Sequence, residues 1–433
     1  MRDYNNCLRP SWGQSVEGIK KLQPDFSITS VENSAMVKSR IREALEPWSA
    51  MLPADRAARI LLKPNFNSNF NALTGNTTDL RLLAGVIEVL QAKGYSDITI
   101  AEGTNSGFVR EGISVIHRLR ADRLASAYGV KIVDLNTWPD TVKVPLENGG
   151  VVEVASLLTT SDFVINMPKL KTHYEVGMSV CMKNLIGTCR GRENKKKIHG
   201  NLGYNIVHLN QAIKSNLHIV DGLIGMEGNG PSRGMPVNFG KIIIGTSPYK
   251  VDYLCARLID FPPSEVKPIA AALKLGLIKP EDVRAWDEIP IAQYQRKFKP
   301  PSVSALVAFV INPKFQRHLI KVRYAPVIRQ ICSSNVVKDM FYKLGISQER
   351  IQNDEASLSF KATAVDCCSC AKCEEYCPLG IDRNTIFGGG GDRCIGCLYC
   401  CSVCSKEAFV LSGNPGFYSQ QISLYGEIIR RIA

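Results

Sequence analysis

The chain has 433 residues, of which 45% are hydrophobic and 21% charged, and its formal net charge is +13. A single domain typically uses about 150 residues, so this length predicts two or three domains. No stretch reaches the roughly 18 uninterrupted apolar residues of a spanning helix, and the N-terminus lacks the apolar segment of a secretory signal, so we expect a cytoplasmic protein.

Residues 1–290 alternate apolar, β-rich runs with helical patterns, which is typical of an α/β domain with a mostly parallel sheet and helices on both faces. The segment 78–94 (TDLRLLAGVIEVLQAKG) predicts an amphipathic helix after a cap at Thr77 and Thr78. Residues 141–156 alternate on both sides of Asn148-Gly149, which predicts an inserted antiparallel hairpin. The predicted strands of the main sheet are 58–66, 97–103, 130–136, 162–168, 217–222 and 241–246.

Polar side chains stand where these predicted strands end. Ligands of open α/β sheets bind outside the carboxyl ends of the strands, so we expect the side chains to meet at one crevice. In the segment KLKTH, Lys169, Lys171 and His173 alternate and would share one side of an extended chain. Two ammonium groups beside an imidazole would suit an anionic small-molecule ligand. The alternative is that KLKTH is a solvated basic loop without a ligand. The strand-end residues are Lys63, Asn65, Glu102, Asn166, Lys169 and Asp221.

Three residues are the catalytic candidates of this crevice: His173, Lys183 and Glu102. We expect His173 to perform acid/base work, because an imidazole titrates near neutral pH and the neighbouring lysines disfavour a second positive charge. Charged groups that converge in a cleft are typical of active sites.

The glycine-rich segment 225–234 (GMEGNGPSRG) follows a predicted strand. It departs from the dinucleotide-binding fingerprint, because Arg233 stands where the third glycine should be and Pro231 interrupts a helix start. We expect a tight loop that approaches the ligand and carries Glu227 and Asn229; a plain turn is the alternative.

Residues 291–360 predict a basic, mainly helical connector. Within it, residues 291–350 hold eleven basic and two acidic side chains, a net charge of +9. Such a run suits an acidic electron-transfer partner or peripheral contact with an anionic membrane more than nucleic acid, because no nucleic-acid motif accompanies it. The alternative is a solvated connector without a partner.

Ten of the fifteen cysteines lie between Cys367 and Cys404, which is typical of metal ligation in a reducing compartment rather than of disulfides. The spacing C-x2-C-x2-C-x3-C occurs twice. In a doubled motif of this kind, the fourth cysteine of each copy ligates the other cluster. A pair of zinc sites is the alternative. The predicted ligands are Cys367, Cys370, Cys373 and Cys404 for one 4Fe–4S cluster, and Cys394, Cys397, Cys400 and Cys377 for the other.

We expect the remaining cysteines to be packing residues rather than cluster ligands, because free cysteine is often simply buried. Cys368 and Cys401 each follow a predicted ligand and would pack near the clusters. The five scattered residues are Cys7, Cys181, Cys189, Cys255 and Cys332.

With these motifs, residues 361–412 resemble the bacterial two-cluster ferredoxins, small α+β iron–sulfur domains. The second copy differs at one point, since Ser405 stands where the first has Pro378. The resemblance implies two 4Fe–4S clusters and one-electron transfer. Residues 413–433 are then a C-terminal tail.

The motifs KPNFN, TTDLR, INMPKLKTH, MKNLIG, DGLIGMEGNGP and VDYLCA resemble the family called domain of unknown function 362, across residues 55–275. Members of that family are often fused to a two-cluster ferredoxin. The resemblance implies a fold and a domain arrangement, but no established reaction.

A fainter resemblance extends to the nickel-pincer lactate racemases, through His173, Gly177, Ser179, Lys183 and His199. It implies that Lys183 would carry the pincer cofactor, His199 would ligate nickel and His173 would be an acid/base. The sequence departs from that pattern after Gly103-Thr104, where Asn105 replaces the second catalytic histidine. The alternatives are a helix-surface lysine and a loop histidine.

These patterns together predict an iron–sulfur redox protein that passes electrons to or from an anionic ligand at the strand ends of the α/β domain. One alternative is an electron carrier or assembly factor whose α/β domain only docks a partner. The other is a racemase-like isomerase or lyase with structural clusters.

Overall fold

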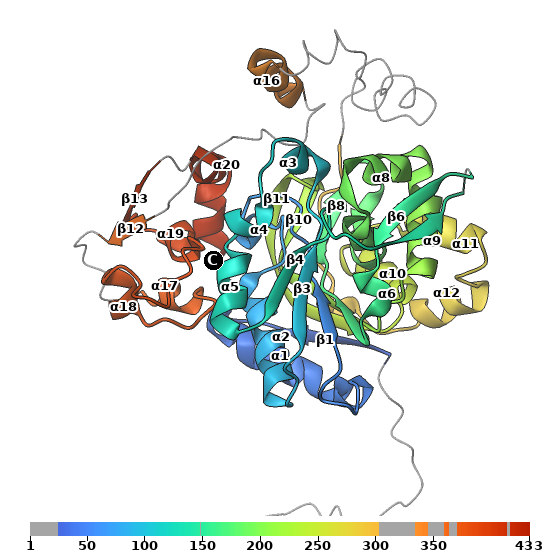
Figure 1. Ribbon diagram of the computed structural model, residues 1–433, viewed down its shortest axis with the longest axis horizontal. Helices are drawn as coiled ribbons and strands as arrows, with labels where there is room; N and C mark the ends of the chain where they lie inside the picture. Colours follow the sequence, from blue (N-terminus) through green and yellow to red (C-terminus); the bar gives the residue numbers. More distant parts are fainter. Residues whose placement is uncertain (1–24, 148, 303–333, 345–358, 363–369, 414–415) are drawn as a thin grey trace, which may run out of the picture.

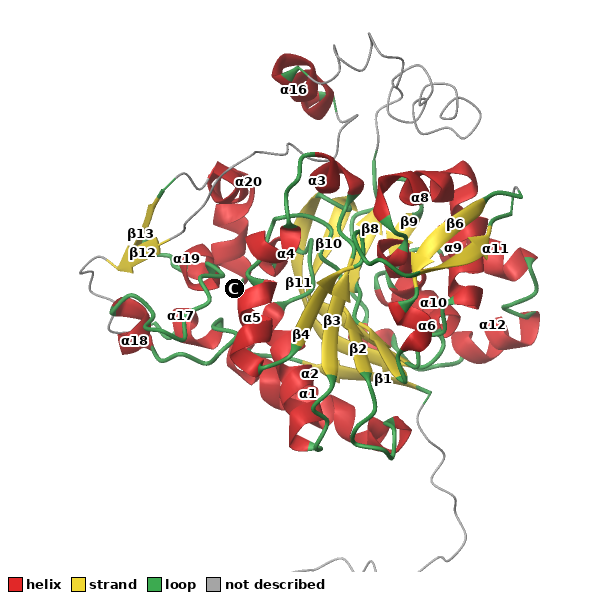
Figure 2. Ribbon diagram, in the orientation of Figure 1, coloured by secondary structure: helices red, strands yellow, loops and turns green. Residues whose placement is uncertain are grey.

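The structure is a computed structural model that describes residues 25–147, 149–302, 334–344, 359–362, 370–413 and 416–433. Within these residues, a nine-stranded sheet has the order β1-β11-β10-β7-β2-β3-β4, and β8 and β9 extend it beside β10. The sheet runs through the middle of the molecule with helices on both faces (Figure 1, Figure 2). The predicted α/β class with a mostly parallel sheet is confirmed.

Five neighbouring strands of the sheet, from β10 to β4 at one edge, run parallel to one another. Their sequences are nearly continuous apolar runs because helices cover both faces. In the first of them along the chain, Ile60 and Leu62 enter one hydrophobic core and Leu61 enters the other, as the alternation of a strand requires. These strands are β2 (Ile60–Lys63), β3 (Ile98–Glu102), β4 (Lys131–Asp134), β7 (Phe163–Asn166) and β10 (Leu217–Asn229).

Antiparallel strands complete the sheet. β1 (Phe26–Ser30) pairs with β11 (Arg233–Gly245), which forms a long hairpin with β10. The predicted ligand-approaching loop at 225–234 is therefore wrong in its greater part, because Gly225–Asn229 pairs with β11 as strand and only residues 230–232 turn. Glycine is needed here for close packing, since a Cβ at Gly225 would lie 3.0 Å from the Phe298 ring.

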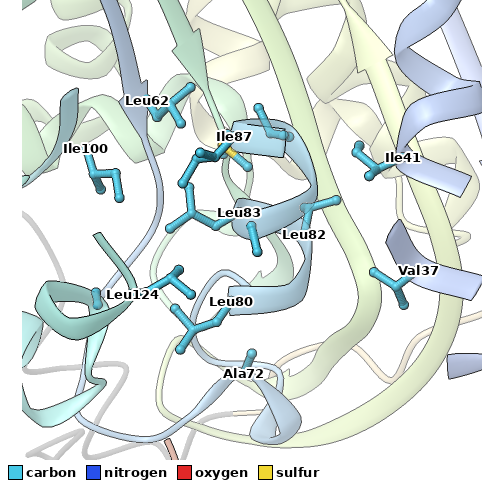
Figure 3. Close-up of a cluster of buried hydrophobic side chains, with 14 of the residues drawn as sticks. Val37, Ile41, Leu62, Ala72, Leu80, Leu82, Leu83, Ile87, Ile100 and Leu124 are labelled. Atoms are coloured by element: carbon cyan, nitrogen blue, oxygen red, sulfur yellow. The ribbon is translucent and has the colours of Figure 1, made fainter. Parts of the chain in front are cut away.

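Helices α1 (Val37–Leu45), α2 (Leu80–Ala92) and α5 (Ala121–Tyr128) cover one face of the sheet (Figure 3). The predicted helix α2 is confirmed, but its N-cap is Asp79, whose side chain accepts a hydrogen bond from Arg81 N. The threonines bond elsewhere, Thr78 Oγ1 to Met167 O. The prediction of an amphipathic helix was also wrong, because α2 is buried on nearly every side between the sheet, α1 and the C-terminal segment.

Helices α7 (Cys181–Asn184), α9 (Leu202–Ala212), α10 (Pro248–Leu258) and α11 (Lys267–Lys274) build the core on the opposite face. The predicted hairpin is confirmed as β5 (Thr141–Pro145) paired antiparallel with β6 (Val151–Ala155). Cys181, Cys189 and Cys255 are buried, as expected. The other described helices before residue 344 are α3 (Ser106–Arg110), α4 (Val115–Arg118), α6 (Leu157–Thr160), α8 (Gly191–Ile198), α12 (Pro280–Asp287) and α16 (Asn335–Lys343).

The C-terminal segment packs against α2 and α5, on one side of the molecule in Figure 1. Its strands β12 (Ser359–Ala362) and β13 (Phe409–Ser412) pair antiparallel. Between them lie α17 (Lys372–Glu375), α18 (Arg383–Phe387) and α19 (Tyr399–Val403). The predicted tail contains helix α20 (Gly416–Ile432), which returns to the sheet through Tyr425, whose hydroxyl donates to Ser232 O at 3.1 Å.

Parts of two predictions fall outside the described residues. Most of the basic run at 291–350 lies in residues 303–333 and 345–350, and of the predicted cluster ligands Cys367 lies in 363–369. Of the scattered cysteines, Cys7 and Cys332 also lie outside, as does Cys368. In the described part of the chain, no helix has the length and apolar character needed to cross a membrane.

Candidate functional site

A cavity of about 190 Å³ opens where the central strands end. One wall is β8 (Lys169–His173), which is extended as the alternating KLKTH segment predicted and pairs with β10 and β9 (Gly177–Ser179). The described residues that line the cavity are Asn65, Asn67, Glu102, Gly103, Thr104, Asn105, Lys171, His173, Tyr174, Glu175, Ser179, Lys183, Asn184, Ile186, Gly187, Lys195, His199 and Pro231.

Six of the residues predicted for the site line this cavity. They arrive from segments far apart in the sequence, and they meet because parallel strands bring their carboxyl ends to the same edge of the sheet. The six residues are Asn65, Glu102, Lys171, His173, Lys183 and His199.

Lys171 is anchored in the cavity wall by amide and carbonyl oxygens. Its Nζ donates to Asn65 Oδ1 at 2.8 Å and to Asn76 O at 2.7 Å. Asn65 Nδ2 in turn donates to Asn184 Oδ1 at 2.8 Å. These two partners of the ammonium group are neutral oxygens, and they hold Lys171 Nζ in the cavity wall.

His173 is buried beside the ring of Tyr174, with 5.2 Å between the ring centroids and an interplanar angle of 12°. Its Nδ1 accepts a hydrogen bond from the backbone N–H of Glu175 at 3.1 Å, so the proton of the neutral ring lies on Nε2. Burial lowers the pKa of His173 well below its usual value, and the charges of Lys183 and Lys171 lower it further. The sequence analysis therefore predicted the direction of the His173 pKa shift correctly, although burial, and not the neighbouring lysines, is the larger cause.

The Glu175 carboxylate lies beside the His199 imidazole in the cavity wall, with 3.4 Å between Glu175 Oε2 and His199 Nδ1. Burial alone would raise the pKa of Glu175, but His199 and the nearby Lys183 and Lys267 hold it at about 2. The carboxylate is thus ionised throughout the neutral range. The sequence analysis did not identify Glu175, although it stands two residues after His173.

Lys183 projects from the short helix α7. Asp252 fixes the start of this helix by accepting hydrogen bonds from Cys181 N at 2.7 Å and from Met182 N at 3.1 Å. Burial lowers the pKa of Lys183 to about 8, against the opposing influence of Glu175. In the part of the chain that the structure describes, its ammonium group makes no hydrogen bond or ion pair.

Lys195 is a further cation of the cavity, which the sequence analysis missed. Its Nζ is enclosed by oxygens and donates to Gly103 O at 2.8 Å, to Thr104 O and to Asn136 Oδ1. Burial lowers its pKa to about 8. Lys195 opens the run KKK, which is typical of a solvated helix face, and no local signal separates it from its neighbours.

Lys63 and Glu102 form a buried ion pair beneath the cavity, with 2.6 Å between Lys63 Nζ and Glu102 Oε2. Glu102 also accepts from Gly103 N at 2.9 Å. Burial lowers the pKa of Lys63 and raises that of Glu102. Lys63 does not line the cavity, whereas Glu102 does.

Five other predicted residues lie away from the cavity, and one of them is Asn166, whose Nδ2 donates to Cys181 O at 3.0 Å. Lys169 and Asp221 form a fully buried ion pair at 2.9 Å, because β10 does not end at Asp221 but continues and passes from β7 to β8. Glu227 accepts from Lys299 N at 2.9 Å, and Asn229 bonds to the backbone of Ser302. The assignment of Glu227 and Asn229 to the crevice was therefore wrong, because the hairpin turns them toward residues 299–302.

A buried chain of charges leads from this region toward the C-terminal segment. Asp221 Oδ2 accepts from Asp79 N at 2.6 Å, and the Asp79 carboxylate binds the guanidinium of Arg81, with 2.8 Å between Oδ2 and Nη2. The guanidinium lies 4.1 Å from the centre of the Tyr376 ring, beside Cys377. Leu80 N donates to the hydroxyl of Tyr399, beside Cys400, at 3.2 Å. Polar contacts thus connect the sheet with both cysteine motifs.

The cysteine motifs meet at one apolar pocket. Cys377 comes from the first motif and Cys394, Cys397 and Cys400 from the second, and all four line this pocket together with Cys373. Four of these five cysteines are the ligands that the doubled spacing predicts for one cluster, whereas Cys373 is predicted for the other. Apolar side chains, among them Ile381, Ile386 and Ile395, form the rest of the wall.

The fourth cysteine of each motif has the same local environment. Ile381 N lies 3.4 Å from Cys377 Sγ, and Ala408 N lies 3.4 Å from Cys404 Sγ, so both thiols receive a backbone N–H four residues ahead. Hydrogen bonds to the sulfurs are one means by which proteins tune iron–sulfur clusters. Cys401 packs toward Leu398, Phe417 and Tyr418, in agreement with a packing role.

The cysteines that share this pocket are a donor set of the kind that an iron–sulfur cluster takes. Burial, followed by the proximity of Cys400, Cys377 and Cys394, raises the pKa of Cys397. Thiolates crowded in this way repel one another unless a cation binds them, and metal binding releases their protons. Among the described residues, no three His, Cys, Asp or Glu side chains are arranged to hold a single metal ion.

Comparison with known proteins agrees with the motifs of the α/β part. Residues 60–257 match the family described as a domain of unknown function (DUF362). A thylakoid-associated protein from Synechocystis sp. is 27% identical over 267 residues, which cover 57% of this chain and 77% of that protein.

Two solved structures resemble the chain distantly. The lactate racemase apoprotein from Thermoanaerobacterium thermosaccharolyticum has 11% sequence identity and a TM-score of 0.38, over 54% of this chain and 57% of that one. A protein from Thermotoga maritima has 16% identity and a TM-score of 0.28, over 46% of this chain and 53% of that one. The chain thus spans little more than half the length of either, and neither likeness assigns a residue a role.

Proposed function

We propose that this chain is an iron–sulfur redox protein, in which two 4Fe–4S clusters exchange electrons with an anionic small molecule bound in the strand-end cavity. The observation that supports this most is the contact between the two parts. Tyr399 lines the cysteine pocket, and its hydroxyl accepts a hydrogen bond from Leu80, the residue between Asp79 and Arg81 of the buried charge chain.

The cysteines would hold the two clusters, and the clusters would supply one-electron transfer. The second cluster would take Cys377, Cys394, Cys397 and Cys400, which share one apolar pocket. The first would take Cys370, Cys373 and Cys404, together with Cys367 outside the described residues. A pocket with an apolar wall excludes water from the cluster, which is one factor that sets its reduction potential.

The cavity residues would bind the ligand and move a proton. Lys171, Lys183 and Lys195 bring three ammonium groups to one cavity, where their charges would attract a carboxylate or phosphate and Lys183 would donate charge-assisted hydrogen bonds to it. His173 carries its proton on Nε2 while Nδ1 is occupied by the Glu175 backbone, so the ring is set to donate from Nε2. The neutral ring would orient the anion through this hydrogen bond, and the ammonium of Lys183, with a pKa of about 8, would release the proton that the reduction of a ligand requires.

A second candidate is racemase-like isomerisation, and one observation favours it. His173, Lys183 and His199 line the same cavity, which is the grouping that a proton transfer or a lysine-bound nickel-pincer cofactor would need. The ammonium of Lys183 has a lowered pKa, and this increases its reactivity as an amine. Nickel in the purified protein would support this candidate.

The third candidate is an electron carrier or assembly factor whose α/β part only docks a partner. It predicts that the cavity residues contribute nothing to activity. We therefore test the redox proposal by purifying the protein anaerobically and identifying co-purifying small anions by mass spectrometry. Each identified anion is then incubated with the dithionite-reduced protein, and cluster reoxidation is followed by absorbance.

The substitution His173→Ala separates the proposals. We expect it to abolish ligand-dependent reoxidation while both clusters stay reducible by dithionite. His208→Ala is a matched control, because His208 lies on α9, pairs with Glu147 at 2.8 Å and is not part of the cavity. Full reoxidation by the His173→Ala variant would favour the docking candidate instead.

A further inference from the structure

A second cavity lies between helix α5 and the cysteine motifs, with a volume of about 540 Å³. Arg123 and Tyr128 line it from α5, and Arg393 and Cys394 line it from the second motif. Cys394 is half-buried here, so the predicted ligands of the second cluster approach the protein surface at this point. The cavity is separate from the strand-end cavity described above.

The mouth of this cavity is basic. Arg123 and Arg393 are exposed, and Arg120 is half-buried beside them. A Cβ added to Gly396, between Cys394 and Cys397, would lie 3.9 Å from Arg123 Nη1 and 4.0 Å from Arg120 Nε. The guanidinium groups therefore lie directly against the loop that carries the cysteines.

Three acidic side chains lie near these arginines, and the charge of Asp122 acts on Arg120. Glu88 binds Lys38 at 2.6 Å and also accepts a hydrogen bond from Tyr128. Asp122 binds His117 at 2.8 Å. Asp392 is the other carboxylate at the cavity among the described residues.

The backbone of one of these arginines, Arg120, is strained. Arg120 precedes α5 with φ of 63°, in the left-handed region that side chains rarely adopt. Burial, followed by the charge of Arg123, lowers the pKa of Arg120, which indicates that the positive charges are close together. Strained residues of this kind cluster at functional sites.

We propose that this basic surface, formed by Arg120, Arg123 and Arg393 around Cys394, is the docking site of a small acidic protein that carries a one-electron redox centre. One electron passes between that centre and the cluster of Cys377, Cys394, Cys397 and Cys400, and no bond forms or breaks. The proposal rests on the proposed function, because it uses the second cluster. Complexes for electron transfer are typically small and depend on charge complementarity, which raises the association rate.

The test compares the variant Arg123→Glu/Arg393→Glu with the wild type and with Arg284→Glu. Arg284 is an exposed arginine on α12, which Figure 1 places on the opposite side of the molecule from α5. The probe is a reduced, acidic 2Fe–2S ferredoxin, and its oxidation by the anaerobic full-length protein is followed by stopped flow at low and high salt. Binding of the oxidised ferredoxin is measured separately by calorimetry.

We expect the double variant to lower the rate constant at low salt by about tenfold or more, while Arg284→Glu leaves it unchanged. The wild-type rate should fall as salt increases, and reduction by dithionite should be equal in all three proteins. Equal rates and equal ferredoxin binding in wild type and double variant would overturn the proposal. So would binding of the wild type, but not of the variant, to phosphatidylglycerol vesicles without any effect on the ferredoxin.

The two proposals fail in different ways. A protein that dithionite cannot reduce contradicts the proposed function, whatever the arginines do. Calorimetry still decides the docking proposal in that case, because it measures binding and not electron transfer. Ferredoxin binding that is lost in the double variant supports the surface, and unchanged binding excludes it.

Discussion

The guanidinium of Arg81 lies 4.1 Å from the centre of the Tyr376 ring, and by this contact α2 meets the first cysteine motif. The same guanidinium binds Asp79, and both side chains are buried. Burial opposes ionisation of Asp79, but Arg81 more than offsets it and lowers the pKa of this carboxylate. The pair therefore stabilises the contact between sheet and cysteine segment only while both charges are present.

We expect Arg81→Met to destabilise the protein by about 3–5 kcal/mol, because it leaves the buried Asp79 carboxylate without its partner. The double variant Asp79→Asn/Arg81→Met should lose less, since no isolated charge is left behind. Urea unfolding of the three proteins measures the difference. Equal stability of Arg81→Met and wild type would show that the pair does not support this interface.

The ion pair of Lys63 and Glu102 leads to a second prediction. Glu102→Gln should destabilise the protein by about 3–5 kcal/mol, because Lys63 would remain charged and buried. In the double variant Lys63→Met/Glu102→Gln this loss should be smaller. Glu102 was a catalytic candidate, and ligand-dependent reoxidation in the double variant tests that role. If the double variant retains ligand-dependent reoxidation, Glu102 has a structural role only.

The third prediction concerns pH. The pKa values of Lys183 and Lys195 are lowered to about 8, so both ammonium groups are charged below pH 8 and lose their protons above it. An anion is attracted only by the charged form, and its affinity should therefore fall as pH rises through about 8. Calorimetric titration with oxalate at pH 6.5 and pH 9.5 measures this change.

Lys183→Met should weaken oxalate binding at the lower pH and reduce the difference between the two conditions. Lys143→Met serves as a control, because Lys143 is an exposed residue of β5 outside the cavity. Oxalate binding that is equal at both pH values would contradict an anion site built on these lysines.

Much of the α/β part follows from local patterns. The apolar runs at 58–66 and 97–103 predicted β2 and β3 because strands buried on both faces need such runs. The strand-end rule also predicted that His173 and Lys171 lie at one cavity, and both side chains line it. Helix α20 had a usable signal, since Phe417, Tyr425 and Ile429 are its buried apolar residues, but these were treated as part of a tail.

Other features depend on contacts between distant segments. Lys195 is part of the cavity because Gly103 and Thr104 bring their carbonyl oxygens to it, and nothing in the run KKK indicates this. Asp79 caps α2 instead of the threonines because Thr78 bonds to Met167 across the sheet. Glu227 and Asn229 leave the cavity because β10 continues past Asp221. Tertiary structure decides each of these cases.

The cysteine motifs give a fourth prediction. Cys377→Ala removes a side chain from the pocket that it shares with Cys394, Cys397 and Cys400, so the second cluster should be lost while the first is retained. Cys404→Ala should damage the first cluster instead. Cys401→Ala is the matched control, because Cys401 packs against Phe417 and Tyr418 and should leave the iron content unchanged. Iron analysis of the three variants distinguishes ligands from packing residues.

The central claim is that the doubled motif holds two 4Fe–4S clusters. Its most direct test is iron, sulfide and zinc analysis of the anaerobically purified protein, combined with electron paramagnetic resonance after reduction by dithionite. We predict about eight iron and eight sulfide per chain, and a signal from reduced 4Fe–4S clusters. Two equivalents of zinc with no iron would contradict the account.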